Sequence, residues 1–121
     1  MKKLVILGAG TAGTMAANKL AKHLPDWQIT MVDQQTTHFY QPGYLFIPFG
    51  AYTPDEVTKP TKKFVPEGVD LVTAAIEKVL PEENKVLLEG GKELPYHYLI
   101  IATGTTPRPD QTPGMEDGLR E

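Results

Sequence analysis

Cysteine is absent from this 121-residue chain, and histidine occurs only three times. Without a thiol, structural disulfides, thiolate metal sites and cysteine-based redox chemistry are excluded from the chain as it stands. The three histidines, His23, His38 and His97, are scattered and have no metal-ligand spacing. No metal site is therefore expected, and no serine–histidine–aspartate arrangement can be argued.

Long apolar runs and clusters of basic residues are missing as well. No stretch approaches the roughly 18 apolar residues that span a bilayer. The apolar run after Lys2 and Lys3 is interrupted by glycine too early for a signal peptide. The net charge is −3 and the basic residues are scattered, which argues against a nucleic-acid surface. We expect a soluble, cytoplasmic domain.

The first 33 residues fit a strand, a helix and a second strand. Residues 2–7 are predicted to form a short strand, since the continuous apolar run of residues 4–7 is closed by glycine, as in a strand buried on both faces. Residues 11–24 place alanines and leucines at helical spacing before Pro25, and residues 28–33 are rich in β-branched side chains. Such a unit closes with parallel strands and a right-handed crossover.

The rest of the chain is expected to add strands to this unit. The segment TPDE at residues 53–56 has the capping pattern of a short helix start. From Pro107 onward the chain has no periodicity. Further strands are predicted at residues 69–75, 76–80, 85–89, 93–94 and 98–102, the middle three as an antiparallel meander.

A glycine-rich turn lies between the first strand and the helix. Its sequence, GAGTAG, matches the pattern G-x-G-x-x-G, and its position between a buried strand and a helix is typical of dinucleotide binding. The first glycine permits the tight turn, the second lets a pyrophosphate approach the backbone, and the third lets the helix pack closely on the sheet. Amides at the helix N-terminus then face the phosphates. The predicted cofactor contacts are Gly8, Ala9, Gly10, Thr11, Ala12 and Gly13.

Asp33 ends the second predicted strand, 23 residues after Gly10. An acid at this distance accepts a hydrogen bond from the adenosine ribose of a bound dinucleotide. Its charge would repel a 2′-phosphate, so NADP is disfavoured at this site.

The glycine turn alone does not distinguish FAD from NAD. The unit begins at Met1, and the third strand leads into a meander that returns to a strand ending in Ala102-Thr103-Gly104. In these two motifs, over residues 1 to about 114, the chain resembles the FAD-binding portion of the pyridine nucleotide-disulfide oxidoreductase superfamily. The resemblance implies an α/β fold: a Rossmann-like FAD-binding domain with a parallel sheet, a crossover helix and a small antiparallel β-meander.

The resemblance also implies further contacts with FAD. Gly104 lets the chain leave its strand sharply, so that Thr103 lies near the pyrophosphate or the ribityl chain. Small residues around Ala74 and Ala75 leave room for the adenine. The additional cofactor residues implied are Gln34, Gln41, Ala75, Ala102, Thr103 and Gly104.

An aromatic segment, HFYQPGYLFIPFG at residues 38–50, holds five of the ten aromatic residues. Its aromatic-x-Gln-Pro step, followed by apolar residues and Gly50, is similar to sulfide:quinone oxidoreductases. Type II NADH dehydrogenases carry a related loop and are the alternative, together with other NAD(P)- and FAD-dependent oxidoreductases. Disulfide reductases instead carry a CxxxxC pair after this position, which is absent here.

The resemblance implies that electrons pass from sulfide through cysteines to FAD, and from FAD to a membrane quinone. In that family the redox cysteines, a second domain and membrane-associating helices lie beyond the point where this sequence stops. We therefore expect an N-terminal fragment that is inactive by itself. Peripheral membrane association and homo-oligomerisation of the full-length protein stay open. Residues 1–106 would be the FAD-binding domain, and residues 107–121 a linker toward the next domain. The competing interpretation is an isolated dinucleotide-binding module without catalysis.

Two assignments within the aromatic segment stay open. Residues 45–49 pack under the flavin domain, line a quinone pocket or touch a membrane, with core packing as the default. His38 and Tyr40 are candidates for acid–base groups, although we favour local hydrogen bonding or packing for both.

Overall fold

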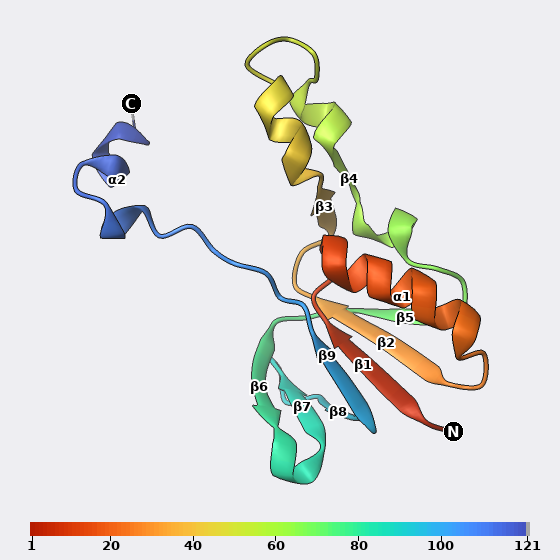
Figure 1. The fold of residues 1–121 in the computed structure, drawn as a ribbon. Helices are drawn as coiled ribbons and strands as arrows, with labels where there is room; N and C mark the ends of the chain where they lie inside the picture. Colours follow the sequence, from red (N-terminus) through yellow and green to blue (C-terminus); the bar gives the residue numbers. More distant parts are fainter. Residues whose placement is uncertain (121) are drawn as a thin grey trace.

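A computed structural model of the protein describes residues 1–120, and a four-stranded parallel sheet forms its centre (Figure 1). The strands are β1 (Lys3–Leu7), β2 (Gln28–Asp33), β5 (Val69–Thr73) and β9 (Tyr98–Ile101), in the order β5-β2-β1-β9. Helix α1 (Thr11–His23) connects β1 to β2. Each pairing in this sheet is parallel, which confirms the predicted α/β architecture and its crossover helix.

The apolar run of β1 is explained by burial on both faces of the sheet. Ile6 packs in a core cluster that includes Ala17 of α1. Its neighbours Val5 and Leu7 point the other way, into a second cluster with Val86. Because neighbouring residues of a strand face opposite sides, a strand covered on both sides needs apolar residues throughout.

The predicted antiparallel meander covers the face of the sheet opposite α1. It consists of β6 (Ile76–Leu80), β7 (Lys85–Leu88) and β8 (Glu93–Pro95), paired in that order. Val86 and Leu88 of β7 are fully buried in the second core cluster. The domain therefore has three layers: helix, parallel sheet and meander.

An arm that the sequence did not predict extends away from the sheet (Figure 1). Strand β3 (Thr37–Phe39) pairs antiparallel with β4 (Thr58–Pro60), and two 3-10 helices, Gln41–Phe46 and Pro54–Val57, lie between them. We call residues 37–60 the aromatic arm. The second 3-10 helix confirms the predicted short helix start, since the Thr53 N–H donates to Glu56 Oε2 at 2.6 Å.

The predicted packing of residues 45–49 in the core is wrong. Leu45 and Phe49 are 73% and 85% exposed, because the arm carries this segment away from the sheet. The arm packs instead on its own small centre, where Val57 is buried beside Gly43.

Several predicted boundaries also need correction. The strand pairings begin at Lys3 and end at Thr73, Leu88 and Ile101, and α1 ends at His23. The predicted ends at residues 2, 24, 74–75, 89 and 102 therefore lie outside their strands or helix. The segment from Pro107 onward, which has no periodicity in its sequence, nevertheless contains the short helix α2 (Met115–Gly118). Over residues 1–120, no helix has the length and apolar character required to cross a bilayer.

Candidate cofactor site

Three turns meet at the carboxyl edge of the parallel sheet. Leu7, the last residue of β1, pairs with Val32 of β2 and with Ile101 of β9. The segments that follow these strands are the glycine turn, Asp33 and the Ala102–Gly104 turn, and they therefore lie side by side. Ligands of open α/β sheets bind at this edge.

Gly8 and Gly13 are glycines because the chain itself requires them. Gly8 has φ +98°, and a Cβ at this position would overlap the Ala102 carbonyl oxygen. A Cβ at Gly13 would overlap the Gly8 carbonyl oxygen. Because both residues lack a Cβ, α1 and the exit of β9 can approach the turn closely.

Gly10 is different, because nothing in the chain occupies the space beside it. Its φ of −75° and ψ of −161° are open to any residue, and a Cβ there would meet no atom within 4 Å. Neither backbone strain nor packing explains this glycine. The residues present therefore fit a ligand that approaches the backbone at Gly10, as the pyrophosphate of a dinucleotide does.

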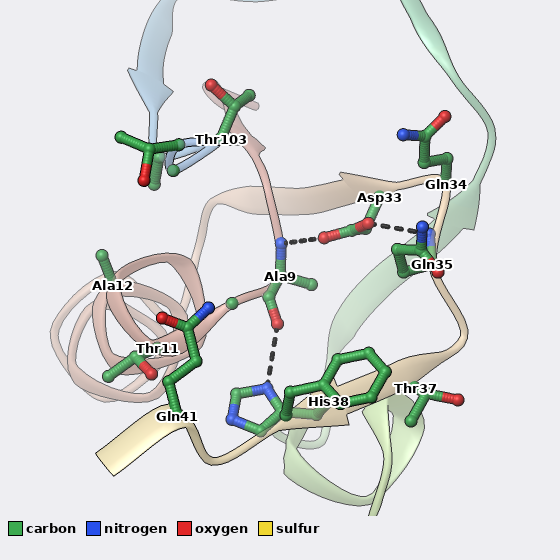
Figure 2. Close-up of a pocket in the computed structure, with 15 residues that line it drawn as sticks. Ala9, Thr11, Ala12, Asp33, Gln34, Gln35, Thr37, His38, Gln41 and Thr103 are labelled. Atoms are coloured by element: carbon green, nitrogen blue, oxygen red, sulfur yellow. Dashed lines mark hydrogen bonds between the residues drawn. The ribbon is translucent and has the colours of Figure 1, made fainter. Parts of the chain in front are cut away.

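Asp33 holds the glycine turn through its carboxylate. Oδ2 accepts a hydrogen bond of 2.7 Å from the Ala9 N–H, and Oδ1 accepts one of 2.8 Å from the Gln35 N–H (Figure 2). A carboxylate has about four lone-pair sites, so two remain for ligand hydroxyls. The predicted contact with a ribose is compatible with this geometry.

The exit of β9 forms the opposite wall of the site. The Ala102 N–H donates to the Leu7 carbonyl at 2.7 Å, which ties this turn to the end of β1. Gly104 has φ +73°, a left-handed conformation that glycine adopts without strain. The strand therefore ends sharply beside the glycine turn.

Two neighbouring cavities lie over these turns, with volumes of about 460 and 230 Å³. They share Asp33, Gln34 and Thr103, so together they follow the sheet edge as an elongated site suited to a dinucleotide. The larger cavity falls in the usual size range of cofactor pockets. Predicted residues that line the larger cavity are Ala9, Gly10, Thr11, Ala12, Asp33, Gln34, Gln41, Ala102, Thr103 and Gly104.

Two more of the predicted residues, Gly8 and Ala75, line the smaller cavity. Gly13 lines neither cavity and instead packs on Gly8. Twelve of the thirteen predicted positions thus meet at one place, although their contacts with a cofactor stay a prediction. Residues at the cavities that the sequence did not indicate are Val32, Gln35, Thr37, Phe39, Ile76 and Thr105.

His38, which we favoured as a locally bonded or packed residue, also lines the larger cavity. Its Nδ1 lies 3.2 Å from the Ala9 carbonyl oxygen, so β3 of the arm contacts the glycine turn (Figure 2). Tyr40 lines neither cavity and is half exposed on the arm. The arm therefore contributes its base, through His38, Phe39 and Gln41, while its aromatic tip projects away.

These features define a Rossmann-like α/β domain with a glycine-rich turn at the carboxyl edge of its sheet. The chain belongs to the pyridine nucleotide-disulphide oxidoreductase family, whose model matches residues 2–121. The resemblance to this superfamily is confirmed.

Known proteins of this kind include sulfide:quinone oxidoreductases. The mitochondrial sulfide:quinone oxidoreductase of Dictyostelium discoideum is 33% identical over 118 residues, covering 97% of this chain and 26% of that protein. The NAD(P)H coenzyme A polysulfide/persulfide reductase of Pyrococcus horikoshii is 31% identical over 120 residues, covering 95% of this chain and 26% of that protein.

A solved structure of the sulfide:quinone oxidoreductase from Aquifex aeolicus has the same fold. It superposes with a TM-score of 0.77 at 26% identity, over 88% of this chain and 25% of the Aquifex chain. The present chain thus spans about a quarter of the length of its relatives.

Proposed function

We propose that this chain is the FAD-binding part of an oxidoreductase that passes electrons from sulfide through FAD to a quinone. The observation that carries the proposal is the open space beside Gly10, at the point where the glycine turn, Asp33 and the Ala102–Gly104 turn meet. The similarity to sulfide:quinone oxidoreductases over almost the whole chain supports the same assignment.

The residues of this chain bind and orient the cofactor. Amides of Gly10, Thr11 and Ala12 at the start of α1 would hold the pyrophosphate. Asp33 would accept from the adenosine ribose, and the small side chain of Ala75 leaves room for the adenine. FAD, when bound, supplies the electron transfer itself.

The other ligands would meet the protein outside these residues. Sulfide and a quinone are the proposed donor and acceptor of the full-length enzyme, with sulfur chemistry at cysteines that this chain lacks. We further propose that residues 1–106 are the FAD-binding domain and residues 107–121 a linker to the remainder of the protein. In support, residues 107–120 are almost entirely exposed and lead away from the sheet (Figure 1).

A second candidate is an NAD(P)H-dependent oxidoreductase that uses the same FAD site, as in a type II NADH dehydrogenase. The similarity to the NAD(P)H-dependent reductase of Pyrococcus horikoshii favours it. The two candidates predict different sequence motifs in the remainder of the full-length protein. Separated cysteines there support sulfide chemistry, whereas a second G-x-G-x-x-G turn without such cysteines supports oxidation of a nicotinamide.

Cofactor binding is tested by adding FAD to the purified chain and removing the excess. We expect the protein to retain flavin absorbance in the visible region, in an amount proportional to the amount of protein. A colourless protein that takes up no added FAD would contradict the proposal. Sulfide-dependent reduction of a quinone by the full-length enzyme then separates the first candidate from the second.

A further inference from the structure

His38 lies outside the glycine turn and contacts its backbone. Its Nδ1 lies 3.2 Å from the Ala9 carbonyl oxygen, 29 residues away in the sequence. A carbonyl oxygen only accepts hydrogen bonds, so this contact requires the proton on Nδ1. The same oxygen accepts a second hydrogen bond, of 3.1 Å, from the Thr14 hydroxyl.

The imidazole is held from a second direction by an aromatic contact. The ring centroids of His38 and Phe64 lie 4.8 Å apart, at an interplanar angle of 48°. The ring is half-buried on β3, at the base of the aromatic arm. Hydrogen bond and packing together fix where Nδ1 lies, so the imidazole acts as a rigid donor to the turn.

Both peptide groups that flank Ala9 are thereby fixed. The Ala9 N–H is bound by Asp33, and the Ala9 carbonyl is bound by His38 (Figure 2). The Thr14 hydroxyl also donates to this carbonyl. The carbonyl of Ala9 and the N–H of Gly10 belong to one planar trans peptide, in which the two groups point in opposite directions. A donor on the carbonyl therefore sets the direction of the Gly10 N–H, which has no acceptor within residues 1–120.

We propose that His38 is a positioning residue that, through the Ala9 carbonyl, orients the Gly10 N–H toward the pyrophosphate of the bound dinucleotide. The inference rests on the proposed FAD site and adds a residue to it that the glycine motif does not contain. It also gives the base of the arm a role in cofactor binding.

A pair of substitutions separates hydrogen bonding by His38 from packing by its ring. His38→Phe keeps an aromatic ring against Phe64 and removes the donor. His38→Asn keeps an N–H donor close to the position of Nδ1 and removes the ring. We expect His38→Phe to weaken FAD binding about three- to tenfold, the range of one ordinary hydrogen bond, and His38→Asn to stay within about twofold of the wild type.

Thr14→Val tests whether the effect passes through the Ala9 carbonyl, because it removes the other donor to the same oxygen. If both residues act on one peptide, the loss in His38→Phe/Thr14→Val differs from the product of the single losses. Independent effects, or His38→Asn binding as weakly as His38→Phe, would overturn the proposal.

A measurement without FAD decides the positioning step separately. Nitrogen-15 NMR of the imidazole in the FAD-free protein is expected to show a protonated Nδ1 and an unprotonated Nε2 in neutral His38. A neutral ring protonated on Nε2 would overturn the inference, whatever the protein binds. An Nδ1–H tautomer together with no uptake of FAD by the wild type would keep the contact with the turn, and would overturn both its role toward pyrophosphate and the proposed function.

Discussion

Gly8 and Gly10 are two residues apart, yet each is a glycine for a different physical reason. Gly8 has a positive φ and no room for a Cβ against Ala102. Gly10 has an ordinary backbone conformation and open space beside it. The first glycine therefore serves the fold, and the second leaves room for a ligand.

Substituting Gly8 by alanine is expected to destabilise the protein. The added Cβ would meet the Ala102 carbonyl, and the residue would keep a left-handed φ, so the loss should be about 1–3 kcal/mol or more. Urea denaturation followed by circular dichroism measures it. An unchanged midpoint would mean that the β9 exit does not press on the turn.

Gly10→Ala is the matched variant with the opposite expected outcome. Its stability should stay within about 0.5 kcal/mol of the wild type, because the methyl group meets nothing in the chain. FAD affinity should fall about tenfold or more, measured by the quenching of flavin fluorescence. Full affinity in this variant would contradict a close approach of the pyrophosphate at Gly10.

The sequence predicted which residues lie around the two cavities better than it predicted the contacts among them. The glycine turn and Asp33 are identifiable because their spacing within one strand–helix–strand unit is fixed by the geometry of that unit. The contact between His38 and Ala9 depends on how the aromatic arm folds back over the turn. No local pattern encodes such a contact.

Among the elements, the aromatic arm is held by its own small centre rather than by the main core. Gly43 is buried there, and a Cβ would come within 2.6 Å of Val57 Cγ1 and 3.0 Å of Tyr40 Cδ1. Gly43→Ala should therefore open the arm and leave the sheet intact. Hydrogen exchange should speed up within residues 37–60 and stay unchanged in β1 and β2.

Gly118→Ala is the control for this arm variant. Gly118 ends α2, and a Cβ there would meet no atom within 4 Å, so hydrogen exchange in the arm should not change. If Gly43→Ala instead accelerates exchange across the parallel sheet, the arm and the sheet unfold as one unit. The account of a separately stabilised arm would then be wrong.

The predictability of the elements follows the strength of their side-chain patterns. The parallel strands, α1 and the meander have apolar periodicity or flanking turn residues, and the sequence predicted each of them. Strands β3 and β4 have three residues each and lie far apart in the chain, too short for an alternating pattern. Their pairing, and the exposure of Leu45 and Phe49, came only from the structure.

For the whole molecule, the decisive feature is the elongated site at the carboxyl edge of the parallel sheet. The glycine turn and Asp33 are suited to an ADP group, and the chain spans about a quarter of its relatives' length. Under the proposed function, residues outside this chain would therefore determine the electron donor and acceptor.

Competition between nucleotides for the purified chain tests this account most directly. A fluorescence titration with FAD, repeated in the presence of ADP and then of FMN, distinguishes recognition of the ADP half from recognition of the flavin. We predict saturable FAD binding that ADP competes away and that FMN, which lacks the ADP half, leaves unchanged. Displacement by FMN but not by ADP, or no binding of FAD at all, would contradict the assignment of this sheet edge as the FAD site.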